Sequence, residues 1–148
     1  MRKVQVQVQR VREQAVIPQY ATEGAAGVDL VACIDAPKRL APGEQVMIPT
    51  GIAIALPARD WVGLIFPRSG LATRSGLVLA NNVGVIDADY RGEIFCPMLN
   101  RGKETVVIEP GDRIAQMVFM PIAVADFVEA EHLEATARGA GGFGSTGI

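Results

Sequence analysis

The stretch PGEQVMIPTGIAIALPARDWVGLIFP, residues 42–67, is the part of the sequence that decides the fold. It holds three apolar runs, at 46–48, 51–56 and 61–66, and Pro or Pro-Gly marks the turns that separate them. Short runs rich in Val, Ile and Phe between such turn residues predict β-strands. Strands that follow one another at this spacing favour a sandwich or a barrel.

The same pattern continues on both sides of this stretch. Val4, Val6 and Val8 alternate with glutamines, as in a half-buried strand. Further strands are predicted at 28–34, 83–86, 93–99, 105–108, 114–120 and 122–128. A short helical turn is predicted only within 69–77, and strands and helices do not alternate as in a parallel nucleotide-binding fold. We therefore expect an all-β protein.

The composition describes an ordinary globular domain. The chain has 148 residues, 49% of them hydrophobic and 20% charged, which fits one domain with a real core. The net charge of −2 provides no broad basic surface for nucleic acid or an anionic membrane. Any phosphate group must therefore be bound by a few well-placed residues.

No secretion or membrane signal is expected. The first residues alternate in polarity and lack the apolar core of a signal peptide, and no apolar run is long enough to span a bilayer. Cys33 and Cys96 are isolated from each other in sequence, which favours two buried thiols over a disulfide. The cytoplasm is the expected compartment.

The last stretch, RGAGGFGSTGI at 138–148, differs from the rest because nearly half of it is glycine. We expect residues 1–137 to form one domain and 138–148 to be a mobile tail. Arg138, Phe143, Ser145 and Thr146 give this tail groups that bind phosphate or cover a ring. From these residues alone, a disordered end is an equally good interpretation.

Two internal segments also carry candidate chemistry. PRSGLA, at 67–72, places an arginine, a hydroxyl and a glycine directly after a strand, although a plain strand end is the alternative. Residues 81–92 resemble a β-hairpin with an Asp-rich turn, in which Asp87 and Asp89 are candidate bases, Asn81 reads a base edge and Tyr90 forms a wall. The alternative is that both aspartates bond their own turn backbone.

Two polar residues stand within apolar runs, and the chain has a single histidine. Asp29 and Gln116 each need a partner, in the structure or in a site. His132 is the only histidine and lies in a charged stretch, so neither a histidine-based zinc site nor a Ser-His-Asp triad is expected. Any metal should be a hard ion bound through oxygens, many of them from substrate phosphates.

Taken in order, five segments resemble the five motifs of the trimeric dUTPase family. They are AAGVDL at 25–30, PRSGLA at 67–72, the stretch 81–93 with GVIDADYRG, PGDRIAQ at 110–116 and RGAGGFGSTG at 138–147. The resemblance implies a jelly-roll-like β-barrel of the β-clip type and a homotrimer. Its active sites would lie at subunit boundaries, and each would combine 67–72, 81–93 and the tail from different chains.

The resemblance also implies the reaction and its central residues. The enzyme would hydrolyse dUTP to dUMP and pyrophosphate, limiting uracil in DNA and supplying dUMP for thymidylate synthesis. Asp87 would be the general base for a water that attacks the α-phosphorus. Asn81 and the backbone at Val85 and Ile86 would read uracil. Tyr90 would pack on the deoxyribose, Phe95 would face the base and Phe143 would cover it.

The remaining implied residues bind phosphates and metal. Arg68, Ser69, Gly70 and Gln116 would hold the phosphates, and Arg138, Ser145 and Thr146 would close over them. Mg²⁺ would bridge the three phosphates, with Asp29 assisting through water. Two other functions remain open: a deoxycytidine triphosphate deaminase of the same broad fold, and a non-catalytic nucleotide sensor that regulates a protein partner.

Overall fold

A computed structural model describes residues 3–142. The protein is mostly β, as predicted, with one short helix within the described residues. Its elements are β1 (Gln7–Arg10), β2 (Val28–Val31), β3 (Lys38–Leu40), β4 (Gln45–Pro49), β5 (Ile52–Ala55), β6 (Trp61–Pro67), α1 (Ser69–Ser75), β7 (Leu77–Leu79), β8 (Gly84–Ile86), β9 (Phe95–Asn100), β10 (Val106–Ile108) and β11 (Arg113–Pro121). The helix predicted within 69–77 is confirmed as α1.

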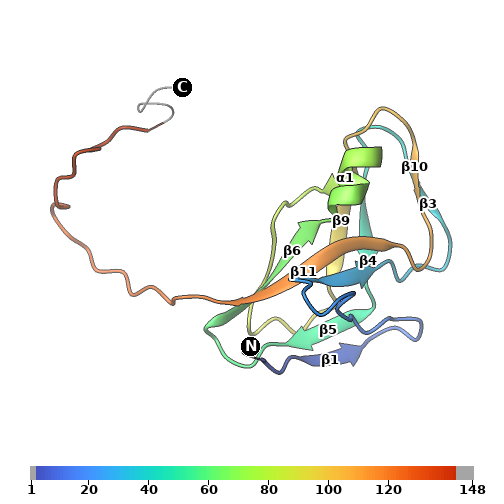
Figure 1. Cartoon of the computed structure of the whole chain (residues 1–148), viewed down its shortest axis with the longest axis horizontal. Helices are drawn as coiled ribbons and strands as arrows, with labels where there is room; N and C mark the ends of the chain where they lie inside the picture. Colours follow the sequence, from blue (N-terminus) through green and yellow to red (C-terminus); the bar gives the residue numbers. More distant parts are fainter. Residues whose placement is uncertain (1–2, 143–148) are drawn as a thin grey trace.

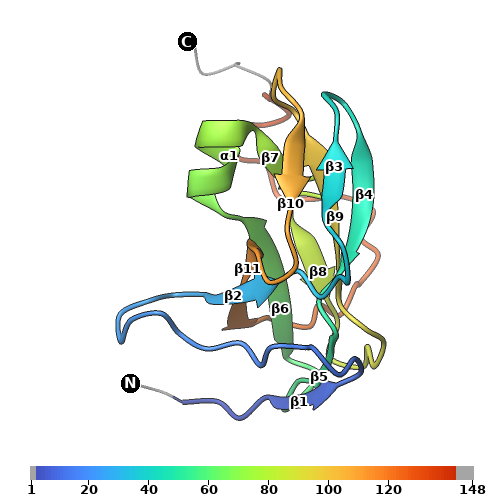
Figure 2. The ribbon, with the colours of Figure 1, turned by 90° about the vertical axis from the view of Figure 1, so that its right-hand side faces the viewer.

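The strands form four antiparallel sheets. The two larger ones have the orders β2-β11-β6-β8 and β4-β9-β7, and the pairs β1-β5 and β3-β10 form the smaller ones. Figure 2 shows β2, β6 and β11 on one side of the body and β3, β4 and β9 on the other. None of the four sheets closes on itself over residues 3–142. The predicted barrel is thus not a closed one, because its wall is divided among separate ladders.

The core lies between these sheets. Leu30, Ile48, Met98, Ile114 and Met117 are among its fully buried side chains, and they come from strands of both larger sheets. Burial alternates along β2, as the two-residue period of a strand requires. Burying this apolar surface is the main force that holds the sheets together.

Three expectations about strands need correction. The first strand begins at Gln7 rather than near Val4, and its four residues are exposed, while Val4 and Val6 pack against the core before it. Strands β3 and β7 were not predicted: two of the three residues of β3 are charged, and β7 begins shortly after the helix. The strand predicted at 122–128 is absent.

Residues 122–142 instead run away from the body as an extended arm (Figure 1). A backbone hydrogen bond from the Ile122 N–H to the Asp60 carbonyl, at 2.8 Å, joins the start of the arm to the body. Phe127 and Val128 are 94% and 83% exposed, so the apolar pattern that predicted a strand has no partner among residues 3–142. No helix within residues 3–142 has the length and hydrophobicity to cross a bilayer.

Candidate active site

One group of predicted site residues meets at the end of β6. Asp29 on β2 binds two arginines, Arg68 through Nε to Oδ1 at 2.9 Å and Arg113 through Nη1 to Oδ2 at 3.2 Å. Arg68 also donates to the carbonyl of Arg113, at 3.3 Å. The Asp29 side chain is 21% exposed and therefore only partly screened by water. We call Asp29, Arg68 and Arg113 the arginine cluster.

Strand register explains why these residues meet. Gln116 on β11 lies opposite Asp29 on β2 and opposite Phe66 on β6, so β11 brings the flanking strands together. The Gln116 side chain donates to the carbonyl of Pro67 at 3.1 Å. Arg68 and Gln116, separated by almost fifty positions in the chain, therefore share one edge of the sheet.

Helix α1 places Ser69 and Gly70 beside the arginine cluster. Arg68 is the N-cap residue and offers no side-chain cap, so its guanidinium is free to bind Asp29. Ser69 is exposed, and a pocket of about 210 Å³ lies next to it, lined by Arg68, Leu71 and Arg113 among others. Arg113 was not predicted as a site residue, although it lies in the quoted segment 110–116. Its position between Asp29 and this pocket is visible only in three dimensions.

The second group lies in the turn after β8. Tyr90 donates its backbone N–H to the Asp87 carbonyl at 3.2 Å and its hydroxyl to the Glu93 carbonyl at 2.9 Å. Arg91 donates to the carbonyls of Ala88 and Tyr90, at 2.8 and 2.9 Å. We call residues 87–93 the catalytic turn, after the role predicted for Asp87.

Within the described part of the chain, neither the Asp87 nor the Asp89 carboxylate accepts a hydrogen bond. This argues against the alternative that both aspartates only bond their own turn backbone. Asp87 is exposed, and its oxygens are available to a ligand. The turn holds its backbone firmly and leaves this side chain free.

The hairpin predicted at 81–92 is wrong in its pairing. β8 pairs with β6, and the strand after the catalytic turn, β9, pairs with β4 and β7. The two arms of the expected hairpin therefore belong to different sheets, because each finds a longer partner elsewhere. The predicted slot would therefore lie between two sheets rather than between the arms of one hairpin.

The residues predicted to bind the base lie around this slot. Val85, Tyr90 and Phe95 are 58%, 42% and 38% exposed, which is high for large apolar side chains. Asn81 lies beside Gly84, where an added Cβ would be 3.4 Å from the Asn81 amide nitrogen. The half-buried Ile86 packs against the core. These residues form an exposed apolar surface with one amide at its edge.

The arginine cluster and the catalytic turn lie at opposite ends of β6. Ile86, next to Asp87, faces Gly63 of β6, whereas Arg68 follows Pro67. Gly63 and Pro67 are four positions apart, which corresponds to about 13 Å along a strand. Within one chain, Asp87 and Arg68 thus lie at separate positions along β6, and the Arg68 guanidinium is bound to Asp29.

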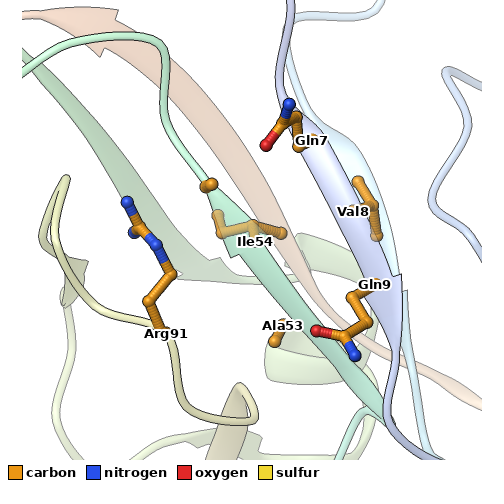
Figure 3. Close-up of a pocket in the computed structure, with 7 residues that line it drawn as sticks. Gln7, Val8, Gln9, Ala53, Ile54 and Arg91 are labelled. Carbon is orange, nitrogen blue, oxygen red and sulfur yellow. The ribbon is translucent and has the colours of Figure 1, made fainter.

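Another pocket, of about 340 Å³, lies between β1, β5 and the catalytic turn (Figure 3). Figure 3 shows Gln7 and Gln9 on β1 and Arg91 approaching from the other side of β5. None of the predicted site residues lines it. This pocket is therefore separate from the candidate site.

The tail contributes one described site residue. Arg138 is exposed and donates through Nε to the Gly141 carbonyl at 2.8 Å. Among the described residues, its side chain has no hydrogen bond to either group of site residues, and the arm of residues 122–142 runs away from the body (Figure 1). Phe143, Ser145 and Thr146 lie outside the described residues.

The side chains available for a metal are few. No group of three or more His, Cys, Asp or Glu residues that could hold an ion occurs within residues 3–142. Both Asp29 oxygens are bound to arginines. A divalent ion would therefore depend on oxygens from a ligand, such as phosphates.

Both cysteines are free and buried, as predicted. Burial raises the pKa of Cys96 to about 12, and burial also raises the pKa of Cys33. Because the thiolate is the reactive form, neither cysteine is suited to nucleophilic chemistry at neutral pH.

Comparisons with known proteins agree with the order of the motifs. The dUTPase family model matches residues 13–147. A deoxyuridine 5'-triphosphate nucleotidohydrolase from Desulfitobacterium hafniense is 52% identical, over 100% of this chain and 99% of its own length. The protein of the same name from Acinetobacter baylyi is 49% identical, over 98% of each chain.

Solved structures agree as well. A Staphylococcus bacteriophage 80alpha dUTPase with dUPNHPP has a TM-score of 0.87 and 28% identity, over 97% of this chain and 99% of that one. A mutant dUTPase from phage phi11 of S. aureus, described as showing the coordination of a structural Mg(II) ion, has a TM-score of 0.79 and 26% identity, over 88% of this chain and 99% of that one. With its motifs in order and a family match over almost its whole length, the chain belongs to the dUTPase family.

Proposed function

We propose that this chain hydrolyses dUTP to dUMP and pyrophosphate by attack of water at the α-phosphorus. The observation that carries the proposal is the catalytic turn: it presents the unpaired Asp87 carboxylate close in sequence to the exposed side chains of Val85 and Tyr90, in a chain of the dUTPase family. Relatives about half identical over their full length carry the name of this activity.

Asp87 is the proposed general base. Its carboxylate would accept a proton from the attacking water as the new P–O bond forms and the bond to the pyrophosphate leaving group breaks. The turn's backbone hydrogen bonds would hold Asp87 in place, so little reorganisation is needed at the moment of reaction.

The slot is the proposed site for deoxyuridine. Asn81 and the backbone at Val85 and Ile86 would bind the uracil edge, and Tyr90 would pack on the deoxyribose where a 2′-hydroxyl needs room. Phe95 and, from the tail, Phe143 would contact the base. Steric exclusion suits this selection, because an apolar pocket alone rejects a near-isostere by only ~10–200-fold.

The arginine cluster is the proposed site for the phosphates. Arg68, Ser69, Gly70 and Gln116 would bind their oxygens, and we add Arg113 to this set because it lines the same pocket. The tail, 138–148, would close over the domain formed by residues 1–137. It would complete the phosphate site with Arg138, Ser145 and Thr146. Arginine suits this work because its guanidinium binds phosphate in a fork.

Mg²⁺ is proposed to enter with the nucleotide. The residues present fit a metal held mainly by phosphate oxygens, since no carboxylate cluster is found in residues 3–142. Bound there, the ion neutralises phosphate charge. With both oxygens on arginines, Asp29 would act on the metal only through water.

A homotrimer with a jelly-roll-like, β-clip architecture is the proposed assembly. It is supported by the separation of Asp87 and Arg68 along β6 and by the long exposed arm. In a trimer, the catalytic turn of one chain would face the arginine cluster of another, and a third chain would supply the tail. From the net charge of −2 we also propose no nucleic-acid or anionic-membrane partner, and we propose a cytoplasmic location because no apolar run of the sequence is long enough to span a bilayer.

The deciding experiment measures pyrophosphate release from dUTP, dTTP, dCTP and UTP, each with and without Mg²⁺. Release from dUTP alone, dependent on Mg²⁺, is expected. Ammonia release from dCTP would instead identify a deaminase, and tight dUTP binding without turnover would identify a nucleotide sensor.

A further inference from the structure

Glu93, the last residue of the catalytic turn, is bound more tightly than its neighbours. Its side chain is 15% exposed and accepts two hydrogen bonds from Arg12, Nε to Oε1 at 2.6 Å and Nη2 to Oε2 at 3.0 Å. The backbone N–H of Gly51 donates to the same Oε1 at 2.9 Å. This is a bidentate guanidinium–carboxylate pair, the most directional kind of side-chain ion pair.

The other side of this contact is rigid. Gly51 has a φ of +73°, and an added Cβ would lie 2.7 Å from both the Cβ of Ala15 and the Sγ of Cys33. The Gly51 carbonyl in turn accepts from the N–H groups of Val11 and Arg12, at 2.8 and 3.3 Å. Arg12 is therefore held by its backbone at Gly51 while its side chain holds Glu93.

From Glu93 the connection continues to the proposed site. The Glu93 carbonyl accepts the Tyr90 hydroxyl at 2.9 Å, and the Tyr90 N–H donates to the Asp87 carbonyl at 3.2 Å. The next residue, Ile94, is tied to β5 by its N–H, which donates to Ile52 at 2.8 Å. A shift of Glu93 would thus move the Tyr90 ring first and the Asp87 backbone after it.

We propose that Arg12 and Glu93 are a positioning pair that holds the catalytic turn in its productive shape. The inference rests on the proposed function, in which Asp87 and Tyr90 contact the nucleotide. Glu93 is the last residue of the motif at 81–93 but has no role in the interpretation given above, and Arg12 precedes the residues matched by the family model. Through Tyr90, the pair also sets how strictly a ribose is rejected.

The pair should contribute only modestly to the stability of the fold. Arg12 is 42% exposed, so water screens its side of the ion pair, while the bidentate geometry and the 15% exposure of Glu93 preserve part of the stabilising effect. A substitution at Arg12 should therefore leave a folded protein. This separates a positioning role from a merely structural one, since a structural tie would change the unfolding temperature without changing substrate choice.

The test compares Arg12→Gln, Arg12→Lys and Glu93→Gln with the native chain. Arg10→Gln is the matched control, because Arg10 is exposed, lies two residues away and makes no ion pair within the described residues. For each variant, kcat and KM are measured with dUTP and UTP, and thermal unfolding is recorded. Hydrogen exchange of a peptide covering 87–93 is followed on the same samples.

We expect Arg12→Gln and Glu93→Gln to lower kcat for dUTP by about 10- to 100-fold, the usual cost of misplacing a reacting group. The preference for dUTP over UTP should fall by about 10-fold, with exchange in 87–93 faster and the unfolding temperature nearly unchanged. Arg12→Lys should recover part of the kcat, because one N–H donor remains. Arg10→Gln should behave like the native chain.

Native kinetics and selectivity in Arg12→Gln would overturn the proposal, as would equal losses in Arg10→Gln. If the native chain itself did not hydrolyse dUTP, the proposed function would fail and hydrogen exchange would decide about the pair. Faster exchange in 87–93 of Arg12→Gln, but not of Arg10→Gln, would then support it. Unchanged exchange would refute it.

Discussion

The arginine cluster and the catalytic turn are held together by different kinds of contact. In the arginine cluster, three charged side chains bind one another at the surface, and the strand register of β2, β6 and β11 brings them together. In the catalytic turn, backbone groups and Glu93 make the bonds, and the Asp87 carboxylate is left free. The arginine cluster presents positive charge that suits an anion, and the catalytic turn presents one unpaired carboxylate that suits the role of a proton acceptor.

This difference predicts which changes affect chemistry and which affect binding. Changes in the catalytic turn should lower kcat, whereas changes in the arginine cluster should raise KM. The predictions that follow test this division, beginning with the largest effect.

Asp87→Asn should have the largest effect. An amide cannot accept the proton of the attacking water, so kcat should fall by about 10²–10⁴-fold. Binding should persist, because no other described group depends on this side chain. Pyrophosphate release measures kcat, and the dissociation constant of a non-hydrolysable dUTP analogue measures binding. A near-native kcat would show that Asp87 is not the general base.

Co-expressing Asp87→Asn with Arg68→Gln should give, at a dUTP concentration far below the KM of Arg68→Gln, more activity than either variant has alone. If the two regions of one site come from different chains, some mixed assemblies contain a site with both native residues. We expect recovery of about 10²-fold over either variant, since a site with both native halves regains its base. Variants purified alone and mixed without subunit exchange serve as the control. If co-expression gave no recovery, each site would belong to one chain.

Deleting 138–148 should slow turnover by about 10²-fold while the fold remains. The described part of this tail is exposed, so its removal takes little from the core. The measurements are kcat for dUTP and the thermal transition. A collapsed transition after truncation would show that the tail is part of the folded domain.

Gly92→Ala should lower kcat by about 10-fold or more, through Tyr90 alone. An added Cβ at residue 92 would collide with the Tyr90 hydroxyl, so the ring must move. Gly24→Ala is the control, because an added Cβ there has no atom within 4 Å. Equal kinetics in the two variants would mean that the ring position does not matter.

Arg113→Gln should have the smallest effect, a rise in KM of a few-fold to about 10-fold with kcat nearly unchanged. Its side chain is 57% exposed, so its charge acts through water. The effect should shrink as salt is raised, which a series of KM values at increasing ionic strength measures. A loss confined to kcat would place Arg113 with the catalytic turn instead.

Much of this protein was determined by local sequence. Turn residues and apolar runs predicted most of the strands, the helix at 69–75 and the two buried thiols, because these depend on neighbours in the chain. The order of five short motifs identified the family, and the family match and full-length relatives confirm it. The roles of the individual site residues remain predictions.

Only the tertiary structure decided which strands pair and which side chains meet. The arms around the catalytic turn look like one hairpin in sequence, yet they join different sheets, because long-range partners bury them better. The apolar run at 122–128 remains exposed, since no described residue of the chain covers it. Arg12 with Glu93, and Asp29 with Arg113, lie more than eighty positions apart in the chain. Such contacts arise from register and packing, to which no local pattern gives access.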